Sequence, residues 1–342
     1  MVTEETLTTE IATPASAQPQ TPEPRRLIEI ISDHLETLRT HHRAVLETDS
    51  VEAVHKMRVS TRKLQAAIDL LGNQAKVRTL KTRLRRWRRA LSRVRNYDVF
   101  LELIEKETAG RGKARREQLQ LITNILRERR VRRAAKVRQF LERADIDAIA
   151  VKLGFNPTAV PQPLSPDLTG DDLLGGRPAV DPAPPTDEFD ERKVVKFAAE
   201  RLDQRLEEFQ ALVAKSHPAT HPAELHKLRI AAKRVRYLLE IISQMGIGDA
   251  AGALTWLRTL QDRIGDWHDL EALEEEIIII LSSGEFMKQH LAESGGMLLA
   301  AAHLQKKKAV LVSRLFPVKV PRYLTTTSQR MARALRRRAK RD

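Results

Sequence analysis

Two stretches of this chain carry one helical pattern: residues 54–71 read VHKMRVSTRKLQAAIDLL, and residues 225–242 read LHKLRIAAKRVRYLLEII. At a constant offset of 171 residues (226 minus 55), the first stretch matches the second at His55 and His226, Arg58 and Arg229, and Arg62 and Lys233. A fixed spacing between matching segments indicates an internal repeat. The sequence therefore predicts two homologous helical halves.

A weaker correspondence lies downstream of each stretch. Residues 91–99 read LSRVRNYDV and residues 260–270 read LQDRIGDWHDL. Asp98 and Asp269 keep the offset of 171 residues (269 minus 98), although the letters between them differ. Two matched signatures at one spacing strengthen the prediction of a repeat.

The repeated helix has two chemically different faces. At 100° per residue, His55, Arg58 and Arg62 fall within about 60° of arc. The apolar residues lie on the opposite side: Met57, Leu64, Ile68 and Leu71. A stripe like this is often only a solvated helix face. Three observations favour a binding role: the stripe occurs in both halves, it holds a histidine each time, and it contains no acidic residue to relieve the repulsion.

Further cations extend the two stripes. From Lys76 to Arg95, ten of twenty residues are Lys or Arg and none is acidic. Arginine suits phosphate because its planar fork donates two parallel hydrogen bonds and keeps its charge. The predicted anion-binding residues are His55, Arg58, Arg62, Lys63, Arg85, Arg88, Arg89, Arg130, His226, Arg229, Lys233, Arg234, Arg236, Arg258 and Lys306.

Composition restricts the function classes. The 342 residues include 60 Lys and Arg against 45 Asp and Glu, a formal charge of +15 that favours an anionic partner. Hydrophobic residues make up 42% but aromatic residues only 4%, which suits aliphatic helix bundles. The absence of cysteine excludes disulfides and thiolate chemistry and is typical of a reducing cytoplasm.

Prolines and glycines divide the chain. The sequence predicts a disordered tail over residues 1–24, a first half over 25–153, a Pro/Gly-rich linker over 154–188, a second half over 189–329 and a basic tail over 330–342. Helix breaks are expected at Gly72, at 110–112 and, in the second half, at sites that include Gly295-Gly296. No segment has the pattern of a strand, a signal peptide or a membrane span.

The paired HKxR helices, with RVRNYDV and GDWHDL downstream, closely resemble the conserved histidine α-helical domain, CHAD. The resemblance covers nearly the whole chain from about residue 27. It implies an all-α fold of two pseudo-symmetric four-helix bundles of antiparallel helices around a basic pocket or channel. It also implies non-catalytic binding of inorganic polyphosphate in the cytoplasm, on polyphosphate granules.

The resemblance also assigns roles to individual residues. It marks the His/Arg/Lys stripes of both halves as ligand contacts. Asn96, Asp98 and Asp269 stand at the family's acidic positions and are expected to orient neighbouring basic side chains. Asn96 replaces a frequent aspartate, so one orienting carboxylate is missing.

Other function classes fit less well. No P-loop, HExxH or GxSxG motif indicates an enzyme, and cations surround both histidines, which disfavours a metal site. No cofactor is expected. Nucleic-acid binding is the main alternative, since the charge would serve equally, but the basic stripes lack interleaved aromatic residues. A role at a membrane surface is also disfavoured, because no helix shows an additional aromatic apolar face.

Overall fold

The computed structural model describes residues 25–72, 74–109, 113–155, 190–217 and 222–341. These residues form eleven helices and no strand, which confirms the all-α prediction. The tail predicted over residues 1–24 and residues 156–188 of the predicted linker lie outside the described residues.

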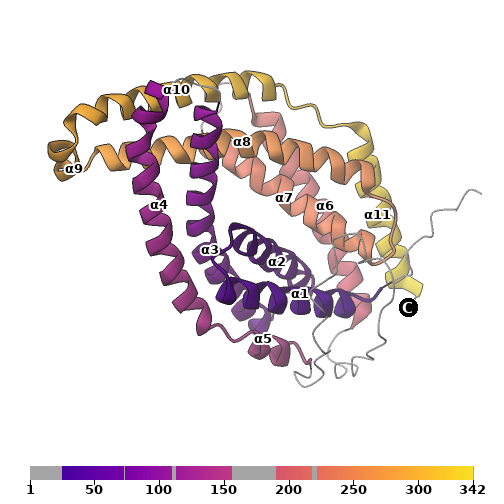
Figure 1. The fold of residues 1–342 in the computed structure, drawn as a ribbon. Coiled ribbons are helices and arrows are strands. Elements are labelled where there is room, and N and C mark those ends of the chain that lie inside the picture. Colours follow the sequence, from indigo (N-terminus) through magenta and orange to yellow (C-terminus); the bar gives the residue numbers. More distant parts are fainter. Residues whose placement is uncertain (1–24, 73, 110–112, 156–189, 218–221, 342) are drawn as a thin grey trace, which may run out of the picture.

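The first half is a bundle in which each helix packs against the next along the chain (Figure 1). Its four long helices are α1 (Leu27–Glu47), α2 (Val51–Asp69), α3 (Ala75–Thr108) and α4 (Lys113–Glu142). The short α5 (Asp147–Lys152) follows, and α4 also contacts α1.

The second half repeats this order with additions. Its helices are α6 (Glu191–Lys215), α7 (Pro222–Gln244), α8 (Ala251–Leu281), the short α9 (Gly284–Gln289), α10 (Leu291–Leu315) and α11 (Arg322–Arg341). The break predicted at Gly295-Gly296 does not occur, because α10 runs through both glycines. Each glycine costs a helix only about 1 kcal/mol, and the buried Met297 and Leu304 hold α10 in place.

The two repeated helices, α2 and α7, bury equivalent positions. In α2 the apolar face predicted from the sequence is buried at Met57, Leu64 and Ile68. In α7 the residues 171 positions later are buried as well: Leu228, Val235 and Leu239. His55 and His226 are both exposed, as expected for the polar stripe. The two helices thus bury the positions that the repeat pairs.

Two hydrophobic cores join the halves. The larger contains buried residues of α1, α2 and α3 together with residues of α6, α7, α8 and α11. The smaller contains residues from α3, α4, α8 and α10, among them Phe100, Ile122, Ile277 and Met297. Direct contacts between α2 and α7 and between α3 and α8 complete the junction. The halves are therefore fused along a common interior.

The predicted tail boundary at residue 330 falls inside α11, which packs along α6. Met331, Ala332 and Leu335 are buried, while Arg333 and Arg337 are exposed. The arginine content of residues 330–341 predicts a solvated tail, but every third or fourth residue in this segment is apolar. Residues 330–341 thus belong to the fold.

Replacing Leu335 with alanine tests this placement. The change should lower the free energy of unfolding by about 2–5 kcal/mol, because Leu335 is fully buried. Arg337→Ala, on the exposed face of the same helix, should change it by less than about 0.5 kcal/mol. Urea titration followed by circular dichroism measures both. Equal and small effects would mean that this end of the chain does not pack.

Candidate functional site

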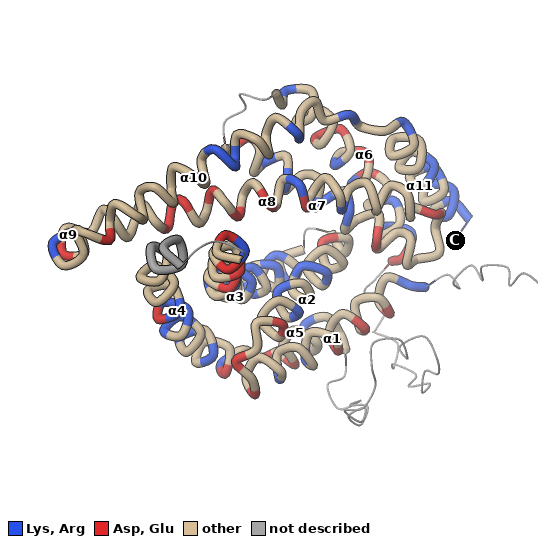
Figure 2. Tube along the Cα trace, turned by 45° about the horizontal axis from the view of Figure 1, so that its top comes forward, with Lys and Arg blue, Asp and Glu red and all other residues tan. Residues whose placement is uncertain are grey.

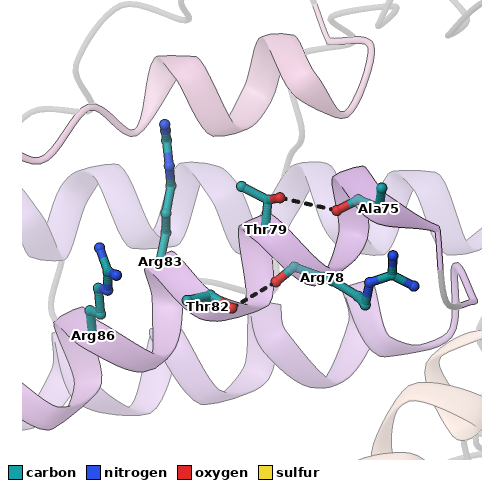
Figure 3. Close-up of a pocket in the computed structure, with 6 residues that line it drawn as sticks. All are labelled: Ala75, Arg78, Thr79, Thr82, Arg83 and Arg86. Carbon is teal, nitrogen blue, oxygen red and sulfur yellow. Dashed lines mark hydrogen bonds between the residues drawn. The ribbon is translucent and has the colours of Figure 1, made fainter.

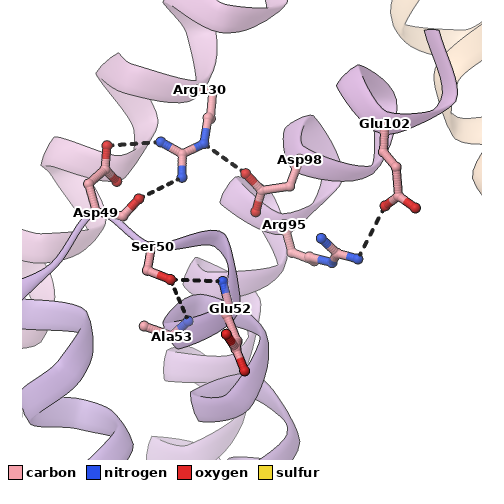
Figure 4. A network of polar contacts seen from close by, with 8 residues as sticks. All are labelled: Asp49, Ser50, Glu52, Ala53, Arg95, Asp98, Glu102 and Arg130. Atoms are coloured by element: carbon pink, nitrogen blue, oxygen red, sulfur yellow. Dashed lines mark hydrogen bonds and ion pairs between the residues drawn. The ribbon is translucent and has the colours of Figure 1, made fainter. Parts of the chain in front are cut away.

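The candidate site lies where the polar faces of α2 and α7 meet. The start of α2 is set by Ser50, whose hydroxyl accepts hydrogen bonds from the backbone N–H groups of Glu52 (3.2 Å) and Ala53 (3.3 Å) (Figure 4). Contact between α2 and α7 brings together four partly buried cations, which we call the central cluster: Arg58, Arg62, Arg229 and Lys233. Figure 2 shows Lys and Arg of α2, α3 and α7 toward the middle of the molecule.

Arg58 is held from the side of α3. Its Nε donates a hydrogen bond to Ser92 Oγ at 2.9 Å. Burial, followed by the positive charges of Arg62 and Arg229, lowers the pKa of Arg58 to about 9. A buried guanidinium next to other positive charges is stabilised by an anionic ligand.

Lys233 is the most strongly perturbed member of the central cluster. Burial lowers its pKa to about 6, assisted by the positive charges of Arg229, Arg62 and Arg58. These neighbours come from both halves, so the two halves share one cluster. At neutral pH the Lys233 amine is mostly uncharged in the free protein.

Arg229 lies against α8. A Cβ added at Gly265 would lie 3.4 Å from an Nη atom of Arg229, in van der Waals contact, so the guanidinium packs closely on the α8 backbone. The Nε of Arg229 is buried without a hydrogen-bond partner among the described residues. Among the acidic residues, Asp269 most strongly opposes the lowering of the Arg229 pKa. Burial raises the pKa of Asp269, while the charges of Arg229 and Arg58 act to lower it. The local charge stays positive.

The histidines border the central cluster. Burial lowers the pKa of His55, followed by the charges of Arg95 and Arg58, and it also lowers the pKa of His226. The ring of His226 lies 5.1 Å from that of His268 on α8. Burial, followed by Arg229, lowers the pKa of His268 to about 4. The surroundings of all three histidines thus disfavour the protonated ring in the free protein.

Several contributors were missed by the sequence reasoning. Arg95 and Ser92 border the central cluster from α3, and His268 does so from α8. Tyr237 lies near the arginines on both helices. All four lie in segments that the repeat singles out: Ser92 and Arg95 in LSRVRNYDV, Tyr237 in LHKLRIAAKRVRYLLEII and His268 in GDWHDL. That they border the central cluster depends on which helix faces pack together.

Some predicted residues lie beside the central cluster. Nη1 of Arg88 donates to Gln65 Oε1 at 2.7 Å, and the pKa of Arg88 is lowered by burial, then by Arg62 and Arg85. Arg236 lies one turn from Lys233, over the ring of Tyr237 at 4.7 Å. These side chains extend the positive surroundings of the site along α3 and α7.

Other predicted residues point elsewhere. The charge of Lys63 helps to lower the pKa values of His34 and His41 on α1. Lys306 is exposed on α10, and Arg89 is exposed on α3. Arg234 approaches Glu208 at 3.8 Å and Arg258 approaches Glu240 at 3.5 Å. The structure therefore does not bring these five cations into the central cluster.

Arg130 is already neutralised. Its Nε donates to Asp98 Oδ1 at 2.7 Å and its Nη1 to Asp49 Oδ2 at 2.9 Å (Figure 4). Asp98 is buried and orients the guanidinium of Arg130 through this hydrogen bond. The two contacts of Arg130 link α4 to α3 and to the residues just before α2. Asn96 is exposed on α3. We assign the Arg130 network to bundle stability.

The described residues hold neither a candidate metal-binding group nor a helix that could span a membrane. In the part of the chain that the structure describes, no group of three or more His, Asp or Glu side chains is placed to hold a metal ion. Within the same ranges, every helix is too short or too polar to cross a bilayer.

Fold and cluster together define a class: an all-helical protein of two related halves that share one group of converging cations. The CHAD domain family model matches residues 29–277, and the chain belongs to this family. Comparison with curated proteins finds no match.

Two solved structures share the fold. One is the CHAD domain from the plant Ricinus communis, with a TM-score of 0.58 and 17% identity over 88% of this chain and 95% of that one. The other is PptA from Streptomyces chartreusis, with a TM-score of 0.51 and 17% identity over 92% of this chain and 98% of that one.

Replacing Lys233 with methionine should stabilise the ligand-free protein. The folded pKa near 6 lies below the ordinary 10.5, so the unfolded chain binds a proton that the folded chain releases. Below pH 6, Lys233 therefore lowers the free energy of unfolding by its full amount. This effect disappears as the pH approaches 10.5. Methionine fills a similar volume without charge, and we expect a gain of about 1 kcal/mol or more at pH 6.

Thermal unfolding at pH 6 and at pH 10 measures this gain. It should be larger at pH 6 than at pH 10. Lys227→Met, at an exposed position of the same helix, serves as the control and should show neither the gain nor its pH dependence. A destabilised Lys233→Met protein at pH 6 would contradict the described burial.

Proposed function

We propose that this protein binds inorganic polyphosphate, or a similarly phosphate-rich linear anion, at the central cluster and does not turn it over. The observation that carries the proposal is the convergence of Arg58, Arg62, Arg229 and Lys233 from two related helices. Burial, and after it the positive charges of their neighbours in the cluster, lowers the pKa values of Arg58, Arg229 and Lys233. An anion in contact with all four relieves the repulsion between these charges.

The arrangement suits a chain of phosphates. Residues four apart on a helix lie about 6 Å apart, so α2 and α7 each present a short row of cations. The arginine forks match phosphate oxygens in pairs, and a protonated lysine adds a point charge. The buried, unpartnered Nε of Arg229 supplies a further donor.

Family membership supports the same ligand. The resemblance to CHAD domains implies polyphosphate binding and association with polyphosphate granules, and we propose both for this chain. Asp269 supports the site by orienting Arg229 and Arg58, which are the opposite charges acting on it.

Neutralising three arginines tests the site. In the triple variant Arg58→Gln, Arg62→Gln, Arg229→Gln, the affinity for polyphosphate should fall by roughly a hundredfold or more, at about 1 kcal/mol for each lost charge-assisted contact. The plot of log affinity against log salt should become shallower by about two. Fluorescence anisotropy with end-labelled polyphosphate across a salt series measures both quantities.

The matched control removes three exposed cations from α11, in Arg330→Gln, Arg333→Gln, Arg337→Gln. This control changes the net charge equally and should bind nearly as the parent does. Equal losses in the two triple variants would show that only net charge matters. Displacement of polyphosphate by duplex DNA at equal phosphate concentration would favour the alternative of nucleic-acid binding at this cluster.

Binding should be coupled to proton uptake. An anion favours the charged form of Lys233 and so raises its pKa from about 6. Affinity should therefore fall as pH rises above 6, and the contribution of Lys233 should level off below 6. The lowered pKa values of His55 and His226 act in the same direction.

Titration calorimetry at pH 7 in two buffers of different ionisation enthalpy measures the proton uptake. The parent should take up protons on binding polyphosphate, and Lys233→Met should take up fewer. Identical heats in both buffers for the parent would remove Lys233 and the histidines from the binding mechanism.

A further inference from the structure

A second group of cations lies on the other side of α3. Arg88, Ser92 and Arg95 point toward α2 and the central cluster. Around the helix axis, the mean direction of Arg86, Arg89 and Arg93 lies about 130° away from theirs. The body of α3 therefore separates two basic surfaces.

The outer surface of α3 is hollowed in two places. The first hollow, of about 410 Å³, is lined by Ala75, Arg78, Thr79, Thr82, Arg83 and Arg86 (Figure 3). The hydroxyls of Thr79 and Thr82 donate to helix carbonyls one turn earlier, at 3.1 Å and 2.9 Å. The guanidinium groups of Arg78, Arg83 and Arg86 are thus the main polar groups that line this hollow.

The second hollow lies between α3 and α4 and encloses about 380 Å³. Its lining residues are Arg86, Arg89, Ala90, Arg93, Arg133, Lys136, Val137 and Phe140. Arg86 borders both hollows, so they form one continuous strip. We call six of its cations the outer band: Arg83, Arg86, Arg89, Arg93, Arg133 and Lys136.

Among the described residues, no carboxylate neutralises the cations of the outer band. No carboxylate lines either hollow, and no side chain of the band forms an ion pair with another residue in the described ranges. Some surface arginines elsewhere are paired, as Arg132 is with Glu128 and Arg336 with Asp203. From Arg83 to Arg93 the band spans about 15 Å of helix, enough for several consecutive phosphates.

The floor of the second hollow is apolar. Phe140 is 42% exposed and lies among the cations, with Val137 and Ala90 beside it. A chain of bare phosphates gains nothing from an exposed ring. A nucleotide chain offers both a phosphate for the arginines and a flat base for the ring.

We propose that the outer band is a separate binding site for single-stranded nucleic acid, with phosphates along the arginines and a base stacked on Phe140. Arginine planes next to an aromatic ring are the usual stacking surface for unpaired bases. Because α3 lies between the two surfaces, this site and the central cluster can be occupied at the same time.

A double charge reversal tests the proposal with a labelled oligoadenylate as the probe. Arg89→Glu, Arg93→Glu should weaken oligoadenylate binding by at least tenfold, beyond any loss in the matched α11 variant Arg333→Glu, Arg337→Glu. Both pairs are exposed and four residues apart on a helix, so the net charge changes equally. Polyphosphate affinity should change no more in the first variant than in the second.

Phe140 separates stacking from charge. Phe140→Ala should weaken oligoadenylate binding by roughly fivefold or more, the effect of losing one stacked base, whereas Phe140→Tyr should retain it. Wild-type binding by Phe140→Ala or by the Arg89/Arg93 variant would overturn the proposal. So would a loss of oligoadenylate binding in the central-cluster triple variant as large as its loss of polyphosphate binding.

Discussion

The structure depends on one electrostatic conflict: the guanidinium groups of Arg58, Arg62 and Arg229 are held around the Lys233 amine, although they repel one another and disfavour its protonation. The restraint comes from the opposite faces of the same helices. Met57 and Leu64 of α2, with their equivalents in α7, are fully buried. Burying such side chains gives about 1.5–3 kcal/mol each, so the cores can tolerate unpaired cations where the halves meet. Stability is thereby exchanged for affinity toward an anion.

The second core explains why the cations stay in register. Residues of α3 and α4 pack with residues of α8 and α10, far from the junction of α2 and α7. Ion pairs reinforce this end, as between Arg129 and Glu276 at 2.5 Å and between Lys307 and Glu107. With cores on two sides of the junction, the halves cannot separate to relieve the repulsion. The central cluster is therefore preorganised for a ligand, which reduces the entropic cost of binding.

The helix α3 has an unusual position because it carries cations on two sides. Its inner face supports the central cluster through Ser92 and Arg88, while Arg86, Arg89 and Arg93 border the hollow shared with α4. A single run of basic residues thus serves two surfaces with different chemistry. Phe140 marks the difference, since the outer surface combines charge with an exposed ring.

The sequence by itself determined the repeat, the all-helical class, the buried face of each repeated helix and the pairing of the His/Arg stripes, because helical periodicity is a local property. It also supplied the list of cations. Only the tertiary structure decided which cations converge, that Asp98 and Asp49 neutralise Arg130, that Arg89 points outward and that residues 330–341 pack as part of α11. These outcomes depend on which face of one helix meets a distant helix, and the spacing of residues along a single helix carries no information about its partner.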